Sequence, residues 1–407
     1  MAKTKPGKQK QQAQKAAKKM ANGQAKPKET PEQLYASALD LVEQSQPDEA
    51  LKQATKLYAQ VQHGSVHEAL PALNLLGEIS VELGDADSAR AYFEQAVKLD
   101  PQGNVPETMG GGAEKFLWLA QLCDEGGKVS VEWYERGAKA LQAEVAAIEN
   151  GTVPGMDAES LLMLRVEKKR KLANALCSIV EVYMTDLSWE EDAEARCESL
   201  ITEAMTMEDE TSPEVLQTLA SVRLSQERKE DAQSALRRSL EIWKDLDPDD
   251  PAVPDFPTRI SLSRLLMEAE TEAAAMDVIR RLVTDDDQSV EAWYLGGWCQ
   301  HLLAERLQAS EHGTKGDATM NVDGSDSVAS AMKGSRNWLK MALKLYGQLD
   351  YEDERLFEHA KVLVAGLDTV LGPEGADAEG GGDEWEEWDG IDDEEVDEVV
   401  DEEMQDS

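Results

Sequence analysis

Residues 70–101, LPALNLLGEISVELGDADSARAYFEQAVKLDP, constrain the fold of this chain more than any other stretch. Small residues at Gly77, Ala89 and Ala96 allow two helices to cross closely, while Gly84 supplies a turn between them and a proline ends the second helix. The large apolar residues that fill the gaps are Leu73, Leu76 and Phe93. Such a helix pair cannot bury its own apolar face, so it must stack on copies of itself.

This spacing resembles the tetratricopeptide repeat, a helix-turn-helix unit of about 34 residues. Weaker copies keep the same order of small and large residues, and Trp293 with Gly297 opens the second-best match. The copies occupy residues 30–57, 116–141, 160–200, 213–239, 260–282 and 293–345, and a last amphipathic helix covers 356–367. The sequence therefore predicts an all-α fold, a right-handed superhelical tetratricopeptide-repeat solenoid of about seven repeats with a C-terminal capping helix.

Charge divides the chain into three regions. Residues 1–28 hold nine lysines and no acid, and residues 374–407 hold 18 acids and no base. We expect both regions to be disordered on their own. Residues 29–373 form the predicted solenoid, which is interrupted at about 308–334 by a flexible insertion rich in Gly, Ser, Asp and Thr.

The predicted solenoid is itself strongly acidic. Residues 29–373 contain 64 acids and 32 bases, so their net charge is about −32. Such a surface repels phosphate backbones and attracts cationic segments, which indicates a basic protein partner and no direct DNA or RNA binding by the solenoid. The sequence has no apolar run of about 20 residues and no signal peptide in residues 1–28. We expect a monomer in the cytoplasm and nucleus that makes no membrane contact.

No catalytic, metal or cofactor site is indicated. The four cysteines form no Cys-x-x-Cys pair, and His63 with His67 lacks a third metal ligand. Residues 110–112 are three glycines, but they lack the strand and lysine of a phosphate loop, so a hinge or linker is the better interpretation. The sequence predicts a protein that is not an enzyme and needs no cofactor.

Function must then reside on a surface. In a stack of such repeats the first helices line the concave side, and residues between their packing positions point into the groove. The predicted partner-binding residues are acidic at one end and aromatic at the other, which suits an extended Lys/Arg-rich peptide with a few apolar anchors. They are Glu78, Glu82, Glu114, Asp124, Glu125, Glu181, Tyr294 and Trp298, accompanied in the same register by Asn74, Val81, Leu117, Gln121, Thr185, Gln217, Ser221 and His301.

The two charged ends keep several interpretations open. Residues 1–28 have the composition of a nuclear import signal that contacts import factors, of an RNA-contacting arm, or of a solubilising tail, and they could also contact the acidic C-terminus. Residues 374–407 place Trp385 and Trp388 among carboxylates, a pattern typical either of a solvated tail or of a contact segment.

Taken together, the repeats with their end helix, the Lys-rich extension and the Trp-containing acidic tail resemble the fungal assembly chaperones dedicated to large-subunit ribosomal protein L-four. The motif residues that carry the likeness are those of the repeat itself, Gly77, Ala89, Phe93, Ala96 and Pro101, and again Trp293 and Gly297. The resemblance implies capture of the long, basic internal loop of that ribosomal protein in the groove. It also implies protection from aggregation and degradation, escort from the cytoplasm to nuclear pre-ribosomes, and release when ribosomal RNA competes for the loop.

Two other functions share parts of the pattern. A histone chaperone or acidic nuclear scaffold also uses an acidic surface to attract a basic protein, and differs only in its client. A heat-shock co-chaperone clamps a terminal carboxylate with Lys, Arg and Asn, whereas the second and third repeats offer Glu78, Glu82, Asp124 and Glu125. The predicted groove is therefore a poor match for that clamp.

Overall fold

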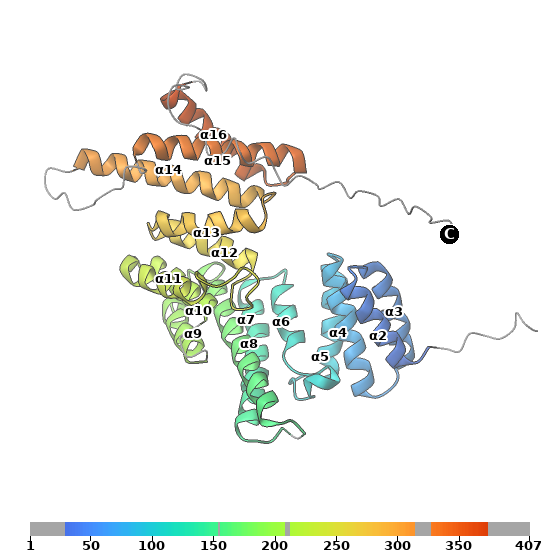
Figure 1. Cartoon of the computed structure of the whole chain (residues 1–407). Coiled ribbons are helices and arrows are strands. Elements are labelled where there is room, and N and C mark those ends of the chain that lie inside the picture. The colour runs from blue at the N-terminus through green and yellow to red at the C-terminus, as the bar shows by residue number, and fades with distance from the viewer. Residues whose placement is uncertain (1–28, 154, 208–211, 314–326, 373–407) are drawn as a thin grey trace, which may run out of the picture. The chain divides into compact units, whose positions relative to one another are not determined.

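The computed structural model describes residues 29–153, 155–207, 212–313 and 327–372 (Figure 1). The predictions made for residues 1–28 and 374–407 lie outside these ranges. Within them every regular element is a helix, as the repeat pattern predicts. The chain divides into two compact units between Thr271 and Glu272, so the two helices of the predicted sixth repeat belong to different units.

The first unit is a series of helix pairs joined by short turns (Figure 1). Each helix packs on the one that follows it, and the first five predicted repeats correspond to five such pairs. The helices are α2 Pro31–Glu43, α3 Pro47–Val61, α4 Val66–Glu82, α5 Ala86–Leu99, α6 Glu114–Gln121, α7 Gly127–Glu149, α8 Ala158–Met184, α9 Ala193–Met207, α10 Pro213–Ser225, α11 Lys229–Trp243 and the unpaired α12 Phe256–Glu268, with a short 3-10 helix η1 at Glu107–Met109.

The second repeat shows why the small residues are required. A Cβ atom added to Gly77 of α4 would lie 2.5 Å from Cζ of Phe93 in α5, so only glycine allows the ring to approach this closely. Ala89, Phe93 and Ala96 are all fully buried along the α5 face that meets α4. Gly84 has φ +73° in the turn between the helices, which favours glycine. The predicted unit is confirmed.

Helix starts follow the capping chemistry of the sequence. Thr30 and Gln33 form a capping box at the start of α2, with Pro31 at the first helical position. Ser65 and Glu68 form a second capping box at the start of α4. These local interactions fix where the first helix of each of these repeats begins.

The three glycines at 110–112 lie in the segment that links η1 to α6. Gly110 and Gly112 have φ +76° and +79°, and a Cβ on Gly111 would lie 1.8 Å from the carbonyl oxygen of Val105. Asn74 of α4 donates from Nδ2 to the Gly110 carbonyl oxygen at 2.8 Å. The glycines therefore form a tightly folded turn held against α4, because backbone contacts this close leave no room for side chains.

The second unit contains α13 Glu272–Asp285, α14 Val290–Gly313, α15 Val328–Leu349 and α16 Glu354–Leu371. Gly297 is the repeat glycine that the sequence predicts, since a Cβ there would lie 2.5 Å from Cγ of Leu339. The helix α16 packs on α15 and buries Ala360 and Leu367, as expected of a terminal helix.

The predicted insertion at about 308–334 is too wide. The helix α14 continues to Gly313, and α15 already begins at Val328, where the Ser327 hydroxyl accepts a hydrogen bond from the Ser330 amide. Gln, Ala and Glu favour a helix despite their polarity, and Ser327 is a good N-cap, so composition alone misplaced both ends. Residues 314–326 lie outside the described ranges.

Candidate functional site

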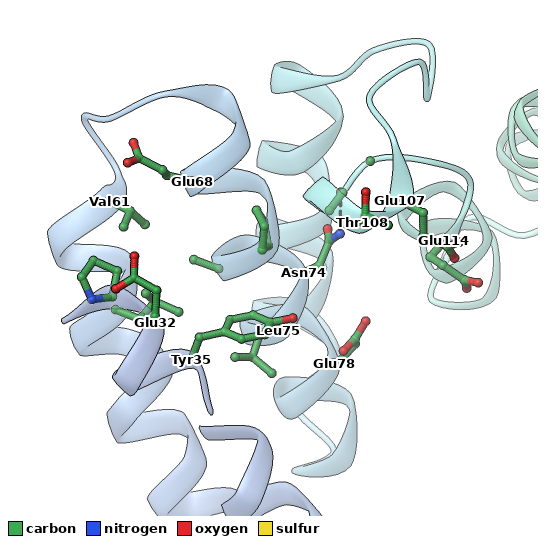
Figure 2. Close-up of a pocket in the computed structure, with 16 residues that line it drawn as sticks. Glu32, Tyr35, Val61, Glu68, Asn74, Leu75, Glu78, Glu107, Thr108 and Glu114 are labelled. Carbon is green, nitrogen blue, oxygen red and sulfur yellow. Dashed lines mark hydrogen bonds between the residues drawn. The ribbon is translucent and has the colours of Figure 1, made fainter. Parts of the chain in front are cut away.

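The first repeats enclose a hollow of about 510 Å³ between α2, α3, α4 and the segment leading into α6 (Figure 2). We call it the N-terminal hollow. Its apolar lining consists of Pro31, Tyr35, Leu57, Val61, Pro71, Ala72 and Leu75. Its acidic lining consists of Glu32, Glu68, Glu78, Glu107 and Glu114, and no Lys or Arg is among the described residues that line it. The hollow combines an apolar surface with carboxylates.

Glu78 is the acid whose environment is most unusual. Its side chain reaches solvent, yet protein surrounds it closely enough that burial, followed by the charges of Glu114 and Glu82 and opposed by Lys171, raises its pKa to about 6. Burial and the charge of Glu78 also raise the pKa of Tyr35. An acid held in this way is stabilised by any cation that enters the hollow.

Two other acids of the hollow are already neutralised from α8. Lys171 pairs with Glu114 at 2.6 Å, and the buried Lys168 pairs with Glu107 and, at 2.9 Å, with Glu144 of α7. Burial acts to lower the pKa of both lysines, but hydrogen bonds and the charges of these glutamates outweigh it and raise them. Glu107 and Glu114 thus hold the repeats together, and they offer less charge to a ligand than Glu78 does.

A second hollow, of about 430 Å³, lies on the first helices of the fourth to sixth repeats, α8, α10 and α12. We call it the central hollow. Its lining is mostly polar: Asn174, Ser178, Glu181, Glu214, Gln217, Thr218, Ser221, Thr258, Ser261, Arg264 and Glu268, with Cys177, Met184 and Leu265. Burial raises the pKa of Glu181, and Nε2 of the buried Gln217 has no hydrogen-bond partner. Glu181, Gln217 and Ser221, which the repeat register assigns to the groove, all line this hollow.

Asp124 and Glu125 do not lie on a first helix, contrary to the prediction. The helix α6 ends at Gln121, so both residues belong to the loop before α7. Arg90 of α5 fixes this end because it donates to the Leu122 carbonyl oxygen at 2.8 Å and also pairs with Asp124. No local pattern in the sequence reveals the pairing of Arg90 with Asp124, which are 34 positions apart.

Tyr294 and Trp298 are covered rather than open. The Tyr294 hydroxyl lies 2.6 Å from Nδ1 of His359 in α16, and the Trp298 ring meets the same imidazole edge-on at 5.6 Å between centroids. Tyr294 is only 8% exposed. The predicted aromatic end of the groove is thus a packing surface for α16, because His359 of this helix contacts Tyr294 and Trp298, the residues predicted to bind a partner.

The chain is similar to known proteins in sequence and in repeat pattern. A tetratricopeptide-repeat family model matches residues 35–104. A protein of Emericella nidulans named probable assembly chaperone of rpl4 is 47% identical over 92% of this chain and 91% of its own length. The chain belongs to the family of rpl4 assembly chaperones.

Further relatives agree with this assignment. A protein of the same name from Schizosaccharomyces pombe is 34% identical over 77% of this chain and 85% of its own length. The solved structure of an assembly chaperone of RpL4, Acl4 (residues 1–338), is 48% identical, covers 69% of this chain and 99% of its own, and has a TM-score of 0.64. The family resemblance and the predicted repeat fold are confirmed.

The sequence of this rpl4 chaperone relative did not reveal the lysines that pair with two acids of the N-terminal hollow. Lys168 and Lys171 reach Glu107 and Glu114 across 61 and 57 positions of the chain, a separation that no local pattern reveals. The available signal was the run of four bases at 168–171, the longest in residues 29–373. Glu32 and Tyr35 of α2 also line the N-terminal hollow, although the sequence predicts no binding residue on this helix.

Neither hollow has the residues of a metal site. Among the described residues, no three His, Cys, Asp or Glu side chains gather where they could hold a metal ion. The described helices also include none with the length and apolar character that a membrane crossing requires.

Proposed function

We propose that this chain is a chaperone of rpl4 that binds the long basic internal loop of this ribosomal protein on the first-helix surface of its first unit. Membership of the rpl4 assembly chaperone family supports the client. The observation that carries the mode of binding is the N-terminal hollow, where Glu78 faces an apolar wall without a described ion pair and has a raised pKa.

The chemistry of the hollow suits a lysine or arginine side chain. The aliphatic stem can cover Tyr35, Leu57 and Leu75, while the cationic end meets Glu78 and Glu32. A bound cation favours the ionised form of Glu78, so binding offsets the cost of burying this charge. The central hollow adds Glu181 and neutral hydrogen-bonding groups, which suit the backbone and polar side chains of the same extended loop.

The acidic surface around these hollows attracts a basic loop from a distance and raises its rate of association. In this proposal the chain acts as a monomer, keeps rpl4 soluble, and escorts it from the cytoplasm to the nucleus with the help of import factors. The net charge of about −32 supports the absence of direct DNA or RNA binding by residues 29–373. Ribosomal RNA then releases the loop by competing for its charges. No chemical step is required of the protein.

The test is the affinity of the full chain for a fluorescent synthetic peptide of the rpl4 internal loop. The double variant Glu78→Lys/Glu82→Lys reverses two charges on α4 and should weaken binding about tenfold or more. The matched control is Glu94→Lys, an exposed acid on the outer helix of the same repeat, which should change affinity less than about twofold. Equal affinities for the two variants would refute this location.

The salt dependence and the natural partners complete the test. Affinity should fall steadily between about 50 mM and 500 mM NaCl because ions screen the surface charges. Affinity purification of the chain with identification of stoichiometric partners distinguishes the client: rpl4 supports the proposal, and a histone pair would replace it.

A further inference from the structure

We propose that the Lys-rich extension, residues 1–28, occupies the N-terminal hollow of the same molecule when no client is bound. The extension is thereby an intramolecular competitor that a basic client must displace. The role as a competitor rests on the proposed function, but the contact between the extension and the hollow can be measured without any client.

The position of the extension favours this contact. The described chain begins at Glu29, whose carbonyl oxygen accepts a hydrogen bond from Nε2 of Gln60 in α3 at 3.4 Å. Pro31 and Glu32, two and three residues further on, already line the hollow. The extension therefore joins the fold at the edge of the hollow. Even a few residues are long enough to reach its acids, since an extended chain advances about 3.3 Å per residue.

The charges are complementary. The extension has nine lysines and no acid, and Lys26 and Lys28 lie closest to the start of α2. Pro27 biases Lys26 toward an extended backbone, the conformation in which a peptide crosses a groove. The described residues that line the hollow include five acids and no base.

The hollow also has acceptors to offer. Oδ1 of Asn74 is buried without a hydrogen-bond partner, while Nδ2 of the same amide is held by Gly110 (Figure 2). Glu78 makes no hydrogen bond or ion pair among the described residues, and its side chain reaches solvent at the hollow. An ammonium group brings three donors and a positive charge, and its stem can lie on the apolar wall. Of these two residues, Glu78 is the one that such a ligand reaches, because its side chain is exposed.

Because the extension is covalently tethered beside the hollow, even a weak contact between them is highly populated. A tethered segment of this length has an effective concentration of the order of 1 mM at its site. If the free peptide binds with a Kd of about 0.1 mM, the tethered peptide occupies most of the hollows and weakens a competing ligand about tenfold. Short basic peptides are then excluded, whereas a long client loop that also contacts the central hollow displaces the extension.

The main experiment replaces all nine lysines of residues 1–28 by glutamine in the full chain. This variant should bind the rpl4 loop peptide about tenfold more tightly than the unmodified chain, and a synthetic peptide of residues 1–28 added in trans should bind to it and reverse the gain. Unchanged or weaker binding of the loop peptide would overturn the proposal, because it would show that the extension is idle or assists the client.

A double-mutant cycle locates the contact. In the Glu78→Lys/Glu82→Lys background the same nine replacements should produce no gain, whereas in the Glu94→Lys background the full gain should persist. A gain that persists in the first background means that the extension binds elsewhere, which overturns the proposal.

Photo-crosslinking separates the other occupants. A photoreactive residue in place of Gln24 should form adducts with α2 to α4 in the free chain and lose them when loop peptide is added. Adducts with residues 374–407 instead would assign the extension to the acidic tail and overturn the proposal. Failure of the loop peptide to bind any variant refutes the proposed function, while binding of the peptide of residues 1–28 remains a separate result.

Discussion

Replacing Glu78 by glutamine should stabilise the protein and weaken its binding of basic ligands at the same time. Glutamine has the same shape but carries no charge, so it removes only the cost of holding a carboxylate in the N-terminal hollow. The raised pKa of about 6, against 4.5 for an ordinary glutamate, means that the folded state holds this proton more tightly than the unfolded state does.

The size of the effect follows from this difference in pKa. A shift from 4.5 to about 6 corresponds to about 2 kcal/mol at most, and we halve this to about 1 kcal/mol because Glu78 is in contact with solvent that screens its charge. Below about pH 4.5 the carboxyl is protonated in both states and the cost vanishes. The cost grows as the pH rises to about 6 and is constant above that.

The assay is differential scanning calorimetry of the full chain near pH 7.5 and near pH 5. Glu78→Gln should raise the midpoint of the transition that melts α2 to α4 by about 2–4 °C at the higher pH, and by clearly less at the lower one. Glu94→Gln, on the outer face of the same repeat, should leave both midpoints unchanged. In parallel, Glu78→Gln should weaken binding of the loop peptide about fivefold near pH 7.5, the equivalent of about 1 kcal/mol.

Two results would refute this reasoning. A lower midpoint for Glu78→Gln at the higher pH would mean that the charge is stabilised by a partner within the protein. An equal gain at both pH values would mean that the substitution acts through packing rather than through ionisation of the carboxyl.

Two further predictions test the packing. Gly77→Ala should destabilise the first unit by about 1–3 kcal/mol because the new methyl group overlaps the Phe93 ring. Gly347→Ala places the same methyl group in open space on α15 and should stabilise the second unit by about 0.5–1 kcal/mol. Urea unfolding measures both free energies, and equal effects of the two substitutions would contradict the close helix crossing at Gly77. Tyr294→Phe should cost about 1 kcal/mol and speed amide hydrogen exchange in α16, because the hydrogen bond to His359 is lost, yet leave loop-peptide affinity unchanged; a several-fold loss of affinity would return this aromatic surface to the binding site.

The repeat fold was predictable because its determinants are local. Gly77 and Phe93 are 16 positions apart, within one unit, and their sizes alone require the close helix crossing. Thr30 with Pro31, and Gly84 in its turn, likewise mark helix ends through contacts with near neighbours. The polar register of each first helix follows from the same periodicity, and Glu181 and Gln217, which share this register on α8 and α10, both line the central hollow.

The errors in the candidate site concern contacts between distant parts of the chain. Arg90 fixes the end of α6 and occupies Asp124, and His359 covers Tyr294 from a helix 65 positions away. Neither partner carries a sequence signal that specifies its target. Periodicity can show which face of a helix is polar, but it does not show which polar residues another element already contacts.

The acids of the N-terminal hollow differ in whether a lysine of the protein already pairs with them. Glu114 is one of the predicted ligands for a basic client, yet the lysines of α8 hold both Glu114 and Glu107 as part of the packing between repeats. A client that paired with them would first have to replace those lysines and gain little. Glu78 makes no ion pair among the described residues, and burial raises its pKa although the charge of Lys171 opposes this rise. In the proposed mode of binding, the net charge of residues 29–373 brings a basic chain near, whereas the few acids left unpaired in the hollows decide where it binds.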